Sequence, residues 1–94
     1  MSEKSITLYR TINYKVLGNH HTLEQFFKRK IDGKMVKDMV KVSFEKLTIQ
    51  KTYAIVRGNT KLLVLRIDTT KIFIITVLID KMQLKRNKAT ILYV

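Results

Sequence analysis

Residues 72–79 read Ile72-Phe73-Ile74-Ile75-Thr76-Val77-Leu78-Ile79, and this run decides the fold. It carries no charge and is rich in β-branched side chains, which is typical of a central strand covered on both faces. Residues 53–57 and 62–67 resemble strands as well, and they flank Gly58-Asn59, a pair that supplies the positive φ angles of a tight hairpin turn. Residues 68–70 form the next turn. These segments together predict an antiparallel meander.

The remaining segments complete one domain over residues 1–94. Residues 6–16 alternate apolar with polar side chains, which predicts a leading strand with one half-buried face that ends at Gly18-Asn19. Residues 82–94 add one more strand or a hairpin around Arg86-Asn87-Lys88. With two helices between the leading strand and the meander, we expect a two-layer α+β fold in which both N-terminal helices pack on one face of a small antiparallel sheet.

Two amphipathic helices are predicted in the first half of the chain. The first spans residues 20–30 and has Leu23, Phe26 and Phe27 as its apolar stripe, with His21, Gln25 and Lys28 on the opposite side and Arg29 at the edge. The second begins after Asp32, a suitable N-cap residue, and ends near Lys41. Its buried stripe comprises Met35, Val36, Met39 and Val40.

The charge balance restricts the partners. The chain has 19 Lys and Arg against 7 Asp and Glu, a net charge of +12 in 94 residues. Like charge at this density repels itself, and nucleic acid is the commonest polyanion that relieves the repulsion. The alternative is a merely basic surface. The chain has no cysteine for disulfides or thiolate metal sites, and its longest apolar run is too short to span a membrane. An alternating segment, not the apolar block of a signal peptide, follows residues 1–4, so we expect a soluble cytoplasmic protein.

A motif at the first helix indicates a specific chemistry. A histidine is followed by leucine, an acidic residue, an arginine and then Ile-Asp, at positions His21, Leu23, Glu24, Arg29, Ile31 and Asp32. This spacing resembles the core of the RegB-type phage endoribonucleases, members of the wider RelE-like microbial RNase fold. The resemblance implies a phage-encoded RelE/RegB-like domain that cleaves messenger RNA without a metal in the host cytoplasm, either free or on the ribosome.

Cleavage by this route needs a base for the 2′-hydroxyl proton, an acid for the leaving oxygen and cations for the phosphate. His21 suits proton transfer because histidine titrates near neutral pH; the alternative is that His20 and His21 only begin the helix. The family's second histidine falls at Lys41 here, and a family arginine falls at Gln25, so neither role carries over. Some RelE-like RNases use Lys, Arg and a C-terminal Tyr, which makes Lys41, Arg57, Arg66 and Tyr93 candidates.

Each candidate has a plainer interpretation. Arg57 and Arg66 are equally well read as solvated charges on a strand, and Tyr93 as a residue that closes the edge of the core. The predicted RNA-binding residues are Lys28, Arg29, Lys34, Lys37 and Arg66, with Lys41 on the same helical face. No cofactor or metal site is predicted. Two functions remain open: a metal-independent endoribonuclease, or a non-catalytic protein of that fold which binds RNA or a host protein.

Overall fold

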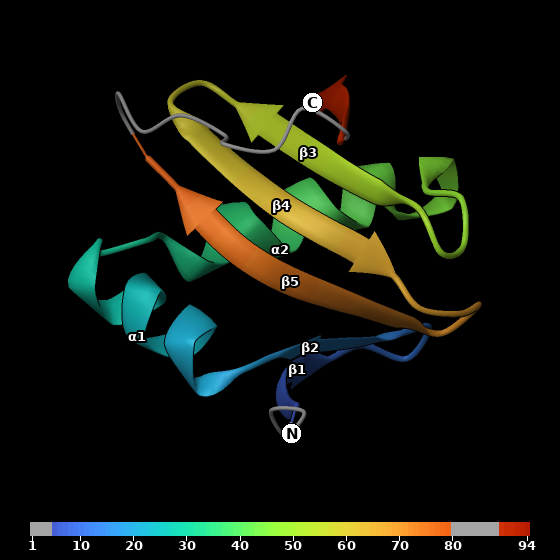
Figure 1. The fold of residues 1–94 in the computed structure, drawn as a ribbon, viewed down its shortest axis with the longest axis horizontal. Helices are drawn as coiled ribbons and strands as arrows, with labels where there is room; N and C mark the ends of the chain where they lie inside the picture. Colours follow the sequence, from blue (N-terminus) through green and yellow to red (C-terminus); the bar gives the residue numbers. More distant parts are fainter. Residues whose placement is uncertain (1–4, 80–88) are drawn as a thin grey trace.

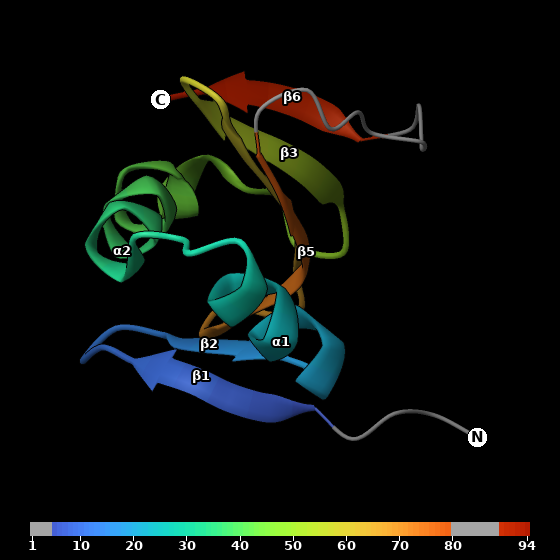
Figure 2. The same ribbon diagram turned by 90° about the vertical axis from the view of Figure 1, so that its left-hand side faces the viewer.

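A six-stranded mixed sheet with both helices on one side forms the molecule (Figures 1 and 2). The computed structural model describes residues 5–79 and 89–94. The order of strands across the sheet is β1-β2-β5-β4-β3-β6. In chain order, the elements are β1 (Ile6–Arg10), β2 (Lys15–Gly18), α1 (His20–Lys28), α2 (Gly33–Ser43), a 3-10 turn η1 (Phe44–Lys46), β3 (Thr52–Arg57), β4 (Thr60–Arg66), β5 (Lys71–Leu78) and β6 (Thr90–Tyr93).

The predicted arrangement of two N-terminal helices on a small antiparallel sheet is wrong. The sheet has six strands and is mixed, because β2 runs parallel to β5 and β3 runs parallel to β6, while the other neighbours are antiparallel. A hairpin of two strands also precedes the helices. Local patterns find strands, but they do not say which distant strand a short one will join. The tail does contain a strand, β6, whereas the turn predicted at residues 86–88 lies outside the described residues.

The segment predicted as one leading strand is a hairpin, β1 and β2, with a turn at Thr11–Tyr14. The Thr11 hydroxyl accepts hydrogen bonds from the backbone N–H groups of Asn13, at 3.2 Å, and Tyr14, at 3.0 Å. The Thr11 N–H in turn donates to the Tyr14 carbonyl at 2.8 Å. Threonine can close a turn in this way without glycine. Ile12, which the alternation placed in the strand, lies at the tip and is fully exposed.

The core lies between α2 and the sheet. Val36, Met39 and Val40 of α2 are buried, as predicted, and Asp32 caps the helix by accepting a hydrogen bond from the Lys34 N–H at 3.0 Å. The sheet residues in the same cluster that are fully buried are Val16, Ile55, Leu62, Val64, Ile72, Ile74 and Val77. Such apolar burial is the main favourable contribution to folding.

Strand β5 is central, as predicted, but only one of its faces is covered. It pairs with β2 on one side and β4 on the other. Ile72, Ile74 and Val77 are fully buried under the helices, whereas Phe73 and Leu78 are only half-buried. The sheet therefore has a second face, called here the open face, that neither of the two described helices covers (Figure 2).

Helix α1 packs through a different side from the one predicted. Its buried residues are Thr22 and Gln25; of the predicted apolar stripe, Phe26 is half-buried against the core, but Phe27 is 74% exposed. The reason lies in β5, whose pairing with β2 covers only Lys71 to Phe73. Beyond that point α1 replaces the missing strand: the Thr22 hydroxyl lies 3.1 Å from both the Ile74 and Ile75 carbonyls, and Gln25 and Arg29 bond further along.

Replacing Thr22 with valine should therefore destabilise the fold although the side chain keeps its shape. The substitution leaves two carbonyls of β5 without their hydroxyl partner, which costs about 1–3 kcal/mol in the free energy of unfolding. Phe27→Ala, at an exposed position, should change that free energy by less than about 0.5 kcal/mol. Urea unfolding of both variants measures the difference. A larger loss of stability for Phe27→Ala than for Thr22→Val would mean that α1 packs through the apolar stripe predicted from the sequence.

Candidate nucleic-acid interface

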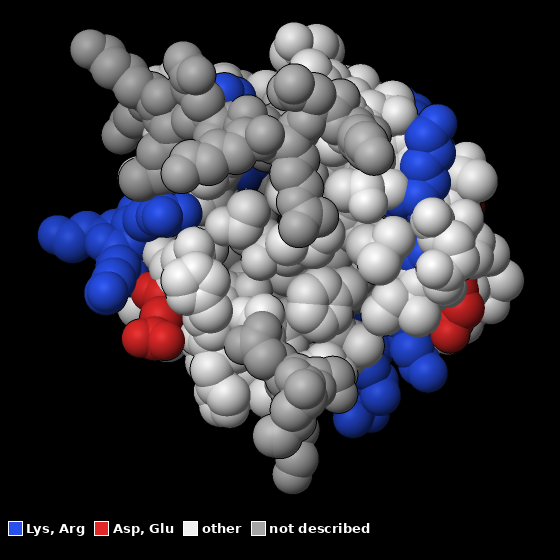
Figure 3. Space-filling model, in the orientation of Figure 1, with Lys and Arg blue, Asp and Glu red and all other residues white. Residues whose placement is uncertain are grey.

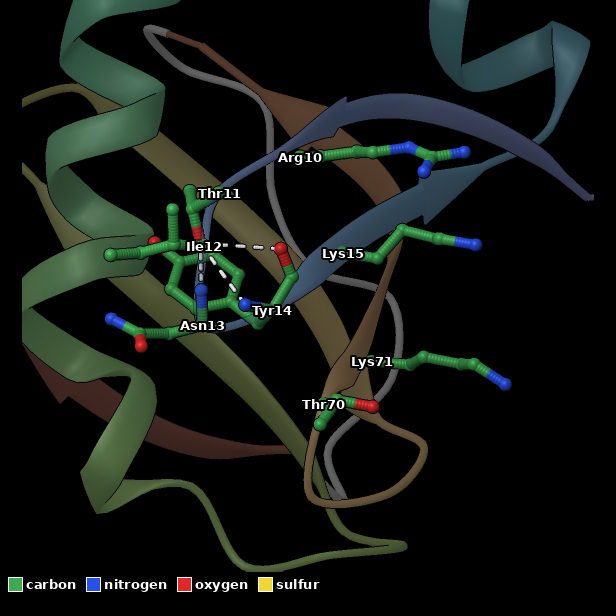
Figure 4. Close-up of a pocket in the computed structure, with 8 residues that line it drawn as sticks. All are labelled: Arg10, Thr11, Ile12, Asn13, Tyr14, Lys15, Thr70 and Lys71. Carbon is green, nitrogen blue, oxygen red and sulfur yellow. Dashed lines mark hydrogen bonds between the residues drawn. The ribbon is translucent and has the colours of Figure 1, made fainter.

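Three cations stand side by side on the open face because of strand register. Arg10 of β1 is paired with Lys15 of β2, and Lys15 is paired with Lys71 of β5. Val16 and Ile72, the next residues on β2 and β5, point into the core, so Lys15 and Lys71 point to the opposite face. The close-up in Figure 4 shows the three side chains extending to the same side. We call Arg10, Lys15 and Lys71 the cation row.

The cation row concentrates like charge that is only partly offset. Directly opposite residues in a sheet have Cβ atoms about 5 Å apart, and like charges at that separation destabilise the pairing. Asp68 lies 3.8 Å from the Lys71 ammonium. Chiefly because the Thr70 N–H donates to it, the pKa of the Asp68 carboxyl is lowered, so it is ionised at neutral pH. Between residues 5 and 79, the only other ion pair found joins Arg57 to Asp38, and neither residue belongs to the row.

The row borders a hollow at the end of the sheet. The cation row, the hairpin turn at residues 11–14 and Thr70 line a cavity of about 320 Å³ (Figure 4). Its rim is held in place by the hydrogen bonds of Thr11, so the cations project from an ordered hairpin. This arrangement provides positive charge and space on one accessible surface.

Apolar side chains continue the open face beyond the row. Leu17, Phe73 and Leu65 are paired with one another across β2, β5 and β4, two residues further along than Lys15 and Lys71. All three are half-buried. Figure 3 looks onto this face, and its middle shows no Lys, Arg, Asp or Glu among the residues coloured, while blue side chains gather at the edges. The open face thus combines a cationic margin with an apolar centre.

His21 lies at the exposed start of α1, where its ring is held by Gln25. The Nε2 atoms of the two side chains are 2.9 Å apart. Gln25 Oε1 accepts a hydrogen bond from the Thr76 hydroxyl at 2.6 Å, so the amide nitrogen is the group turned toward His21 and donates to its ring. The ring nitrogen that accepts this bond is occupied, whereas a general base needs a free lone pair.

The other predicted catalytic residues are not gathered around His21. His21 belongs to the helix that packs on β5, whereas Tyr93 is on β6, three strand spacings or about 14 Å away across the sheet. Tyr93 also faces the open side, since Leu92 and Val94 pack toward the core. Arg57 forms an ion pair with Asp38 at 2.7 Å, and Lys41 is exposed near the end of α2. His21 and Tyr93 are thus far apart, whereas Arg57 is bonded to the helix that carries Lys41.

The predicted RNA-binding residues divide into two groups. Lys28, Lys34 and Lys37 are exposed on the helices, the first on α1 and the other two on α2. The Lys37 ammonium lies 5.3 Å from the centre of the Tyr9 ring, whose phenol pKa is raised by burial. Arg29 instead donates to the Val77 carbonyl.

Arg66 acts as a structural anchor in the described chain. Its guanidinium donates to four backbone carbonyls, those of Phe44, Leu47, Asp68 and Thr69, at 2.9 to 3.1 Å. It also lies over the Phe44 ring at 4.1 Å. These bonds join η1 to the turn between β4 and β5, and they occupy all three guanidinium nitrogens.

Sequence patterns did not single out the cation row. Arg10, Lys15 and Lys71 are far apart or on opposite sides of a turn, and only the hairpin and the parallel pairing of β2 with β5 align them. One signal was present: Thr11 and Asn13 are turn-forming residues between two cations.

Comparisons with models of known protein families, with curated proteins and with solved structures found no match. In the described residues, no group of His, Cys, Asp and Glu could hold a metal ion. The helices described are also too short or too polar to cross a membrane. The link to the RegB-type and RelE-like proteins therefore rests on the His21 motif alone.

Proposed function

We propose that this protein binds RNA through the open face of its sheet, without cleaving it. The observation that carries the proposal is the cation row, in which strand register holds Arg10, Lys15 and Lys71 side by side. Phosphate groups relieve the repulsion within such a row and release counterions as they bind. The net charge of +12 favours the same class of partner.

The open face is a better candidate than the lysines of α2. On α2, Asp38 lies among the lysines, and one of them already contacts the Tyr9 ring. On the open face, Asp68 is the single carboxylate within 4 Å of the row in the described chain. The open face also carries three paired, half-buried apolar side chains next to its cations, Leu17, Phe73 and Leu65.

A binding role also fits the arrangement of the predicted catalytic residues. The His21 ring nitrogen is engaged by Gln25. Tyr93 lies on the open face of the sheet and not beside His21. The His21 motif is what favours RNA over DNA as the nucleic acid. We propose the cytoplasm as the place where it acts, that of the host if a phage encodes it.

Neutralising the row should weaken RNA binding much more than neutralising α2. We expect Arg10→Gln with Lys15→Gln to lower affinity for labelled RNA at least tenfold at about 0.1 M salt. A plot of log affinity against log salt concentration should have a slope near −2 for single-stranded RNA bound to the wild type. Each phosphate contact contributes about −0.7 to this slope, and each of the three cations is expected to make one contact. Fluorescence anisotropy measures both quantities.

The matched control is Lys37→Gln with Lys41→Gln, which removes the same two charges from α2 and should lower affinity less than threefold. A larger loss of RNA affinity in this control would mean that the helices, and not the open face, bind the RNA. Gel analysis of the same labelled RNA, with EDTA and with ribosomes added, should show intact RNA. Cleavage that His21→Ala abolishes would restore the endoribonuclease hypothesis.

Lys15→Glu should stabilise the protein while weakening RNA binding. A carboxylate at this position replaces two repulsive neighbours by two attractive ones, which adds about 1 kcal/mol to the free energy of unfolding at low salt. Lys41→Glu makes the same change in net charge away from the row and should stabilise less. Urea unfolding at low and high salt separates the two effects. A destabilised Lys15→Glu protein would mean that the row is not under repulsion.

A further inference from the structure

We infer that the open face takes single-stranded RNA and rejects the duplex, with bases packed on Phe73 and Tyr93. This inference rests on the proposed function and names the form of RNA that the same site accepts. It starts from the apolar centre of the face, which phosphate binding alone does not use.

On β2 and β5, the next side chain beyond the cation on the open face is apolar. Phe73 follows Lys71 by two residues on β5, and Leu17 follows Lys15 by two residues on β2. Residues two apart on a strand point to the same face and lie about 7 Å apart. A strand of RNA with phosphates on the row therefore has its bases beside Phe73.

A second group of accessible apolar side chains lies at the far edge of the sheet. Tyr53 and Ile55 of β3 point into the core, so Ala54 and Val56 face the open side, where both are buried. Register pairs Ala54 with Ile91 and Val56 with Tyr93. Ile91 is 52% exposed and Tyr93 is 74% exposed, which leaves an aromatic ring accessible on the edge strand β6.

These features match an unpaired strand better than a duplex. In a duplex the faces of the bases are stacked inside, and only phosphates, sugars and base edges reach a flat protein surface. In a single strand the base faces are free to stack on aromatic side chains, whatever the base. A second copy of this chain fits less well, because a two-fold interface places the same patch on both subunits and adds a second cation row.

The test compares 12-nucleotide oligouridylate RNA with a 12-base-pair RNA duplex, both labelled for anisotropy at equal salt. Wild-type protein should bind the single strand at least about tenfold more tightly. Tyr93→Leu and Phe73→Leu should each lower single-strand affinity by about fivefold or more, the low end of what a base–aromatic contact contributes, and leave duplex affinity unchanged. Tyr93 is exposed, so Tyr93→Leu tests the inference even if Phe73→Leu is unstable.

Phe27→Leu is the matched control, because Phe27 is an equally exposed aromatic residue on α1, and it should leave both affinities unchanged. Equal binding of both RNA forms, still lost on neutralising the row, would overturn this inference and leave the proposed function standing. The absence of salt-sensitive binding to either RNA would overturn the proposed function itself. A dimer in solution that Tyr93→Leu dissociates would assign the face to a second copy and so also overturn the inference.

Discussion

The structure depends on how the two edges of β5 are satisfied. Buried backbone N–H and C=O groups need hydrogen-bond partners, and β5 crosses the centre of the molecule. One edge pairs with β4 along nearly its whole length, but β2 pairs with only the first three residues of the other. Side chains of α1 complete that second edge, at Ile74, Ile75 and Val77. The position of α1, and therefore of the chain that leads into α2, follows from this requirement.

The same requirement explains which parts of the fold the sequence predicts. The two helices, the Asp32 cap and the hairpin at Gly58-Asn59 depend on neighbours in the chain, and all were predicted, although α1 ends earlier, at Lys28, and α2 ends at Ser43, slightly beyond Lys41. The orientation of α1 was not, because the apolar residues Leu23, Phe26 and Phe27 gave the larger pattern. Thr22 and Gln25 are buried only because β5 offers unpaired backbone groups at that point. Nothing within residues 20–30 carries that information.

The candidate site could be predicted even less, since it is made by register. The high net charge indicated a polyanionic partner, but it did not say where the charge would gather. Arg66 shows the difficulty, for a cation on a strand is indistinguishable by sequence from one that binds a ligand, and here its guanidinium is used by four carbonyls. Lys15 and Lys71 are 56 positions apart in the sequence and become neighbours only through the parallel pairing of β2 with β5.

Strand β5 also links stability to the proposed binding. Its alternate residues Ile72 and Ile74 hold the helices, and this fixes Lys71 and Phe73 on the other side, because successive side chains of a strand point to opposite faces. A one-residue shift of β5 would bury a lysine and expose two isoleucines, so the apolar core enforces the register that aligns the cations. The repulsion within the row is tolerated because burial of β5 is the larger effect. The row can therefore be both rigid and highly charged. This favours a binding surface that is already formed before the anionic ligand arrives, and not one that forms only on binding.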